Sequence, residues 1–188
     1  MRVNKHIKID IYSRLIPLTA LLYIAGCAKE PINYETDLVE KEGVYFTKDS
    51  DLPYSGEVFT LYTSGDIKEE GNLEKGLMSG SWTYWNEDGN KYSEETYKNG
   101  YKEGQFILYK DGNRQREGGY LNRKKHGLFI EWYDNGQMKQ EGTFKEGRLS
   151  GVWSYWNEEG HKYKEETYKD GKKDGLFTEY HPNGQKSI

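Results

Sequence analysis

Three of the four histidines, two of the pairs of adjacent glutamates and the one cysteine are the residues whose types could support chemistry. His126, His161 and His181 fall outside HExxH and similar zinc-binding spacings. The pairs Glu94-Glu95 and Glu165-Glu166 lie 71 residues apart in a longer segment that recurs, so they belong to a repeat and not to an acid/base pair. No G-x-S-x-G, P-loop or G-x-G-x-x-G motif occurs. We therefore expect no catalytic residue, no metal ligand and no cofactor, and interpret the chain as a protein that is not an enzyme.

The single cysteine, Cys27, excludes intrachain disulfides and multi-thiolate metal sites, but its position indicates another chemistry. Residues 1–14 carry four basic residues against one acid, and an apolar run from residue 15 to 24 follows. This pattern is typical of a secretory signal peptide, and the run is shorter than the roughly 20 residues that span a bilayer. Ile24-Ala25-Gly26-Cys27 resembles the lipobox of bacterial lipoproteins, which implies cleavage between Gly26 and Cys27 and acylation of Cys27. The alternative is an ordinary signal peptide with an incidental cysteine.

Removal of residues 1–26 would leave 23 Lys+Arg and 30 Asp+Glu, a formal charge of −7. A protein this acidic would not adhere to an anionic leaflet through its own surface, so we expect the lipid on Cys27 to hold it at the membrane. The predicted location is extracytoplasmic. Ala28 follows the cysteine, which in lipoproteins of two-membrane bacteria implies the outer membrane. We expect residues 27–42 to act as a polar tether and residues 43–188 to form the folded domain.

The composition favours an unusual β protein. The chain has 188 residues, enough for one domain, and only 34% of them are hydrophobic, with a mean hydropathy of −1.03. Aromatic residues nevertheless reach 15%, and there are 22 glycines. Aliphatic residues are too few for the buried parallel strands of a conventional α/β enzyme. The charge balance also argues against a nucleic-acid partner, which normally needs a basic excess.

Glycines mark a repeat of about 24 residues, which is the element that must position any functional side chain. Two sets of glycines recur at this interval: Gly56, Gly80, Gly104, Gly127, Gly151 and Gly175, and then Gly65, Gly89, Gly112, Gly136, Gly160 and Gly184. A longer repeat is superimposed, because residues 79–100 and 150–171 agree at 16 of 22 positions. A block of three short repeats therefore appears twice in the chain.

Each short repeat predicts a β-hairpin. A first strand follows the anchor glycine, a turn follows at dipeptides such as Asp88-Gly89 and Asn135-Gly136, and a return strand ends in an aromatic residue or leucine. A second turn at Lys75-Gly76 or its equivalents leads to the next hairpin. Frequent glycine and the absence of a 3.6-residue period argue against helices. We expect an all-β fold, an elongated single-layer antiparallel meander of about a dozen strands.

These motifs resemble the MORN repeat, and more closely its bacterial variant in proteins of the YwqK antitoxin family. The resemblance rests on Gly80-Ser-Trp82 and its equivalents, on the spacing from Trp85 to Gly89, and on return segments such as Glu141-Gly-Thr-Phe144-Lys-Glu-Gly147. It covers residues 43–188 and implies a single-layer sheet that contacts proteins or lipids. One link departs from the pattern, since Asn122-Arg-Lys-Lys-His126 replaces the usual turn.

Two rows of large side chains recur along the repeats. The first lies two residues after the anchor glycines: Val58, Trp82, Phe106, Phe129, Trp153 and Phe177. The second lies three residues further on, and its members Trp85, Tyr109, Trp132, Trp156 and Tyr180 are the candidate binding surface. Positions three apart in a strand face opposite sides unless a bulge intervenes. Either one row binds a polypeptide or glycan, or both rows only stabilise the sheet through cross-strand contacts.

The leading functional hypothesis is a non-catalytic, membrane-anchored scaffold outside the cytoplasm that binds a protein or glycan and no nucleic acid. Homodimerisation through an open sheet edge near Ile188 is a further possibility. The family resemblance implies an alternative, an antitoxin or immunity-type protein that neutralises an extracytoplasmic toxin. An enzyme acting on the cell envelope is the third hypothesis, and no motif supports it.

Overall fold

The computed structural model describes residues 30–187, so Gly26, Cys27 and the expected signal peptide lie outside the described residues. Each hairpin contains one forward strand and one return strand, except the last, in which β15 is followed only by the isolated bridge of Tyr180 with Lys186. The forward strands are β4 (Gly56–Leu61), β6 (Leu77–Trp85), β8 (Tyr101–Lys110), β11 (Gly127–Trp132), β13 (Arg148–Trp156) and β15 (Lys172–Glu179). The return strands are β5 (Ile67–Glu74), β7 (Lys91–Lys98), β9 (Asn113–Leu121), β12 (Met138–Lys145) and β14 (Lys162–Lys169).

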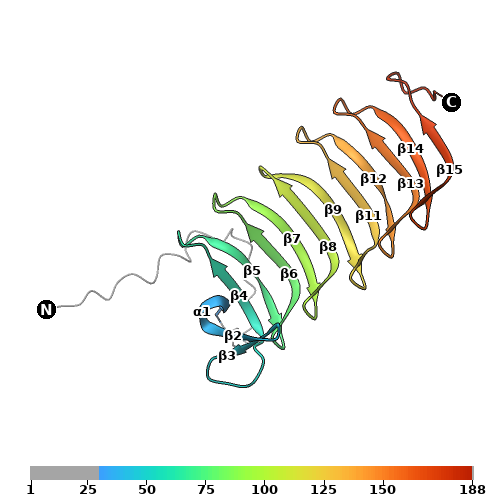
Figure 1. The fold of residues 1–188 in the computed structure, drawn as a ribbon. Helices are drawn as coiled ribbons and strands as arrows, with labels where there is room; N and C mark the ends of the chain where they lie inside the picture. The colour runs from blue at the N-terminus through green and yellow to red at the C-terminus, as the bar shows by residue number, and fades with distance from the viewer. Residues whose placement is uncertain (1–29, 188) are drawn as a thin grey trace, which may run out of the picture.

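These hairpins form one long sheet in which strands that follow each other in the chain also pair. The 13-stranded sheet runs from β1 (Ile32–Asn33) through β4 to β15 in chain order, with only the short β10 (Lys124–Lys125) off this path, paired to β9. All pairs are antiparallel except β1 with β4. The hairpins stand side by side along one axis (Figure 1). The expected all-β, elongated, antiparallel meander is confirmed.

The turns between hairpins use the left-handed backbone that the dipeptides predict. Both central residues have positive φ, for example 52° at Lys75 and 76° at Gly76, as a two-residue type I′ turn requires. The exceptional link after β9 keeps this geometry without a glycine, because Asn122 and Arg123 adopt φ of 52° and 64°. The Arg123 guanidinium carbon lies 3.4 Å from the centre of the Tyr101 ring, which helps to hold the turn.

The strand register separates the two rows of large side chains onto opposite faces. In the second hairpin Tyr84 pairs with Ser93 and Trp85 with Lys91, so the extra residue of the bulge, Tyr92, belongs to the return strand. From Trp82 to Trp85 the forward strand therefore alternates without interruption. The face that carries Trp82 and its equivalents is called the core face below, and the face that carries Trp85 and its equivalents is called the open face.

The core face buries its row of side chains by fitting tryptophan against glycine. Trp82 is 1% exposed and Trp153 is 3% exposed. A Cβ built on Gly71 would lie 2.2 Å from the Trp82 ring, and one on Gly142 would lie 2.1 Å from the Trp153 ring. Only glycine leaves this space, so each indole lies directly on the backbone of the preceding return strand.

Glu95 interrupts this buried row between the two clusters of the core, and Glu166 ends the second cluster, since Phe177 beyond it is 51% exposed. Glu95 pairs with Trp82 on one side and with Phe106 on the other, and Glu166 stands in the same way between Trp153 and Phe177. One cluster is built around Val58, Leu73 and Trp82, and the other around Phe106, Phe129 and Trp153. The core is therefore a row of aromatic packing units and not a single continuous layer.

The first cluster has a cap formed by the segment just before the repeats. This cap comprises β1, α1 (Tyr34–Asp37), β2 (Leu38–Lys41) and β3 (Val44–Thr47), at the β4 end of the sheet (Figure 1). Leu38 is 5% exposed, and the Tyr34 ring meets the Trp82 ring edge-on at 6.0 Å. The expected tether, residues 27–42, is therefore folded from Ile32 onward, because its apolar side chains cover the end of the core. Within residues 30–187 no helix has the length and hydrophobicity that crossing a membrane requires.

Candidate binding surface on the open face

The five residues predicted as a binding surface share one face and one level of the sheet. Trp85, Tyr109, Trp132, Trp156 and Tyr180 are all half-buried, each at the end of a forward strand or directly after it. The register places each opposite the start of its return strand, as in Trp85 with Lys91 and Trp156 with Lys162. With neighbouring strands about 4.8 Å apart, successive members lie roughly 10 Å apart along the sheet. The structure thus brings all five candidates together in one row.

A row of carboxylates runs beside the aromatic row on the open face. Its members occupy the same position in every return strand: Glu70, Glu94, Glu117, Glu141 and Glu165. Each pairs with the forward-strand residue that lies two positions before an aromatic, as Glu94 does with Thr83 and Glu165 with Ser154. Residues two apart in a strand point to the same face, so acids and aromatics share the open face.

Two of these carboxylates are held by the same set of partners in the two copies of the duplicated block. Glu94 binds Lys91 and accepts a hydrogen bond from the Tyr109 hydroxyl at 3.0 Å. Glu165 accepts from Lys162 at 2.8 Å and from the Tyr180 hydroxyl at 2.6 Å. In each case the lysine lowers the pKa of the carboxyl group below its usual value, with the tyrosine hydroxyl adding to the effect.

Two of the three carboxylates that precede tryptophans have a different environment, whereas the third, Glu117, binds Arg114 at 2.9 Å. Where Trp85 and Trp156 replace tyrosine, no hydroxyl is available to the preceding Glu70 and Glu141. An apolar residue, Ile67 or Met138, also replaces the cation three positions earlier. Among residues 30–187, the side chains of Glu70 and Glu141 make no ion pair or hydrogen bond. A half-buried indole beside an unpartnered carboxylate is able to bind a polar ligand, because the ring stacks while the carboxylate accepts hydrogen bonds.

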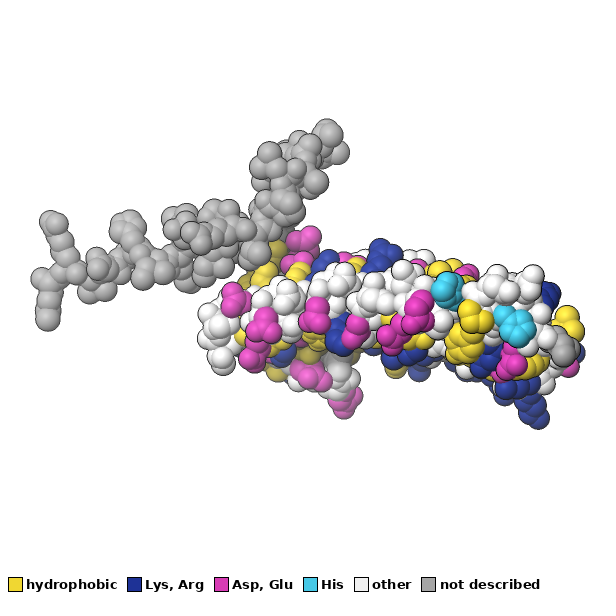
Figure 2. Space-filling view, turned by 90° about the horizontal axis from the view of Figure 1, so that it is seen from above, with side chains coloured by type: hydrophobic (Ala, Val, Ile, Leu, Met, Phe, Trp, Pro, Cys, Tyr) yellow, Lys and Arg dark blue, Asp and Glu magenta, His cyan; other side chains and the backbone are white. Residues whose placement is uncertain are grey.

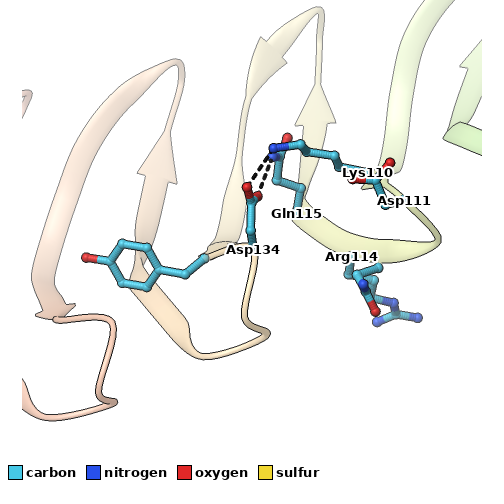
Figure 3. Close-up of a pocket in the computed structure, with 7 residues that line it drawn as sticks. Lys110, Asp111, Arg114, Gln115 and Asp134 are labelled. Carbon is cyan, nitrogen blue, oxygen red and sulfur yellow. Dashed lines mark hydrogen bonds and ion pairs between the residues drawn. The ribbon is translucent and has the colours of Figure 1, made fainter.

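The histidines and a small surface pocket do not form a site. His126 lies in the link before β11, whereas His161 and His181 lie in turns within hairpins, and the described residues hold no group of His, Cys, Asp or Glu able to bind a metal. A shallow pocket of about 80 Å³ lies between two hairpins, where Lys110 reaches Asp134 at 2.6 Å and Arg114 points away (Figure 3). Lys110 lowers the pKa of Asp134. The pocket is an exposed ion pair without converging buried groups.

Sequence reasoning found the aromatic row and missed the carboxylate row. In the sequence only Glu94-Glu95 and Glu165-Glu166 stand out, as part of the duplicated block. The register now separates the members of each pair, since Glu95 and Glu166 lie on the core face and Glu94 and Glu165 on the open face. The recurrence of glutamate at one position in all five return strands was the available signal.

Comparison with known proteins yields a repeat family and a partial structural likeness. No curated protein matches the chain. Among solved structures, a mutant of S. aureus TarM in complex with fondaparinux, alpha-GlcNAc-glycerol and UDP matches at 14% identity and a TM-score of 0.34, over 50% of this chain and 19% of that one. Another TarM structure matches at 14% identity and a TM-score of 0.34, over 54% of this chain and 20% of that one. The chain thus spans about a fifth of these proteins. Four segments of the chain, residues 78–99, 125–146, 149–170 and 173–187, match the model of the MORN repeat variant family.

Proposed function

We propose that the protein is a non-catalytic binding scaffold, held at the outside of a membrane by a lipid on Cys27, that binds a protein or glycan along the open-face aromatic row. The observation that carries the proposal is the separation of the faces. Tryptophans of the core face are 1–3% exposed, whereas Trp85, Trp132 and Trp156 stay half-buried although the fold gives them no packing layer. Aromatic side chains left half-covered on a rigid surface are typical anchors for a partner.

The repeat suits this function because its side chains have fixed spacing. Each aromatic is placed by a hairpin whose backbone hydrogen bonds continue into the next, so the row has little freedom to adapt. Lys162 adds a cation 5.0 Å from the Trp156 ring centre, and the carboxylate row runs beside the aromatic row. A ligand with alternating apolar and polar groups, such as an extended polypeptide or a glycan, fits this arrangement.

Crosslinking in cells tests the proposal. Cells that express the full-length protein are compared with cells that express Trp85→Ala/Trp132→Ala/Trp156→Ala, and the crosslinked partners are identified by mass spectrometry. We expect the triple variant to lose a defined partner while its denaturation midpoint stays near that of the wild type. Retention of every partner would contradict the proposal.

A matched control removes exposed aromatic rings from the opposite side of the sheet. Tyr92 and Tyr163 are 45% and 44% exposed, and their rings lie 6.0 and 6.4 Å from the core-face residues Tyr84 and Tyr155. Tyr92→Ala/Tyr163→Ala should retain the partner. If the captured partner were toxic when expressed alone, the scaffold would act as the immunity protein that the family resemblance implies.

The membrane anchor has its own test. Cys27 lies five residues before Ile32 in the chain, and five residues span at most about 18 Å, so the lipid would lie close to the β4 end of the sheet. Cys27→Ser should abolish metabolic labelling with a radioactive or clickable fatty acid and release the protein from the membrane fraction. Labelling that persists in Cys27→Ser would contradict acylation of this residue.

A further inference from the structure

A track of cations without counter-ions crosses the second half of the open face, on the side of the turns between hairpins. It consists of Lys124, Lys145, Arg148, Lys169 and Lys172, all exposed and none engaged in an ion pair within residues 30–187. Lys145 pairs directly with Arg148 across β12 and β13, and Lys169 with Lys172 across β14 and β15. Like charges placed directly opposite each other destabilise a sheet, so folding alone gives no reason for this arrangement.

An apolar band lies next to the cation track. Leu128 is 52% exposed, Val152 56% and Leu176 80%, and Thr143 and Thr167 lie opposite Leu128 and Val152 in the neighbouring strands. Thr143 and Lys145 are two residues apart in one strand, so the band and the track are separated by roughly 7 Å. The first half of the sheet has no apolar band and no opposed cation pair, since Lys98 there lies opposite Tyr101. Glu57, Ser81 and Gln105 occupy the positions of the apolar band there.

Three kinds of partner differ in how well they would cover the apolar band and neutralise the cation track. A second copy could offer the turns within its hairpins, which carry seven acids and form the edge seen in Figure 2: Asp66, Glu87, Asp88, Asp111, Asp134, Glu158 and Glu159. These turns hold no aliphatic side chain and would leave the apolar band uncovered. An anionic bilayer would cover it but would also approach the carboxylate row on its other side, about 7 Å away and within a Debye length.

We propose that the cation track and apolar band form a docking surface for an amphipathic polypeptide segment that has carboxylates along one side of an apolar stripe. A single segment about 10 Å wide covers the apolar band and reaches the cations while its other flank meets the carboxylate row. Three aliphatic anchors about 10 Å apart match positions two helical turns apart in an amphipathic helix. This surface is separate from the aromatic row, so the proposal stands independently of the function proposed above.

Fluorescence anisotropy with synthetic helical peptides tests this proposal on the purified full chain. The probe contains leucines along one stripe and glutamates beside it, and a second peptide has lysine in place of every glutamate. We expect the acidic peptide to bind, with an affinity that falls as salt rises, and the basic peptide to bind at least tenfold more weakly. Equal binding of the two peptides would overturn the proposal, as would binding only to vesicles that contain an anionic lipid.

Two charge-reversal variants with the same net charge provide the control. Lys145→Glu/Lys169→Glu breaks both opposed pairs, whereas Lys48→Glu/Lys75→Glu reverses two exposed lysines elsewhere. We expect the first to weaken binding of the acidic peptide at least tenfold while its denaturation midpoint rises, because two repulsive pairs become attractive. The second should leave binding within about twofold. A track variant that binds normally, or that loses binding only by losing stability, would refute the docking surface.

Discussion

Trp153 and Trp156 lie three residues apart in β13 and experience opposite environments. Trp153 is 3% exposed, rests on Gly142 and donates from its indole nitrogen to the Thr143 carbonyl oxygen at 3.2 Å. Trp156 is half-buried beside Lys162 and Glu141. The same holds for Trp82 and Trp85 in β6. A single-layer sheet therefore places tryptophans of one strand in two environments, one buried in the core and one half-buried on the open face.

The largest difference in stability between the two faces is expected when one tryptophan is replaced at a time. Trp153→Ala removes a buried side chain and should lower the free energy of unfolding by about 3–5 kcal/mol. Trp156→Ala should lower it by less than about 1 kcal/mol, since its side chain is already partly hydrated. Equilibrium denaturation in urea, followed by circular dichroism, measures both. Similar losses for the two variants would mean that the open-face row is structural after all.

A smaller effect is expected from the glycine beneath the core-face tryptophan. In Gly142→Ala the added Cβ would lie 2.1 Å from the Trp153 ring, and the displacement should cost about 1–3 kcal/mol of unfolding free energy. Gly151→Ala is the control, because its Cβ meets nothing within 4 Å and only its φ of 71° opposes the change. That strain should cost about 1 kcal/mol. If Gly142→Ala proved the milder change in urea denaturation, close packing would not explain the glycine.

The smallest expected difference between the two faces is in how adjacent glutamates, Glu165 and Glu166, affect the pH dependence of stability. Burial of Glu166 opposes its ionisation, but Lys173, Tyr168 and Lys164 outweigh that effect and lower its pKa to about 2. Because the folded-state pKa lies below the unfolded value, this group stabilises the protein above about pH 4.5, and the stabilisation disappears as pH falls toward 2.

Thermal denaturation at pH 2, 3, 4 and 6 measures this contribution. Glu166→Gln should flatten the decline of the midpoint between pH 4.5 and 2 more than Glu165→Gln, whose more exposed carboxyl group is partly screened by solvent. An identical pH profile for wild type and Glu166→Gln would show that the core-face ion pairs contribute nothing to stability.

Much of this architecture follows from local sequence signals. Turn dipeptides such as Lys75-Gly76 require positive φ, and alternation along a strand places Trp82 and Trp85 on opposite faces, so hairpins, meander and aromatic rows are all predictable. The cap is not, because Ile32 and Leu38 acquire their role only through contact with β4 and the first cluster, and no repeat marks them. The carboxylate row and the cation track escape prediction for another reason. They consist of common surface residues, and only the strand register shows which of them lie side by side, as Lys145 does opposite Arg148.

The packing of each core-face tryptophan on a glycine limits which hairpins can be deleted or added without disturbing the core. Joining Trp82 to Ser154 would remove one full three-hairpin block. The remaining indole would still lie between Gly71 of the preceding return strand and Glu166 of the following one, the same kinds of neighbours that it has in the intact chain. Excising residues 104–150 instead would set Trp153 behind Glu95, where a side chain occupies the space that the indole needs. The units are thus modular only in certain lengths. Shorter or longer versions of this protein should therefore differ by numbers of hairpins that keep a glycine on the strand before each core-face tryptophan.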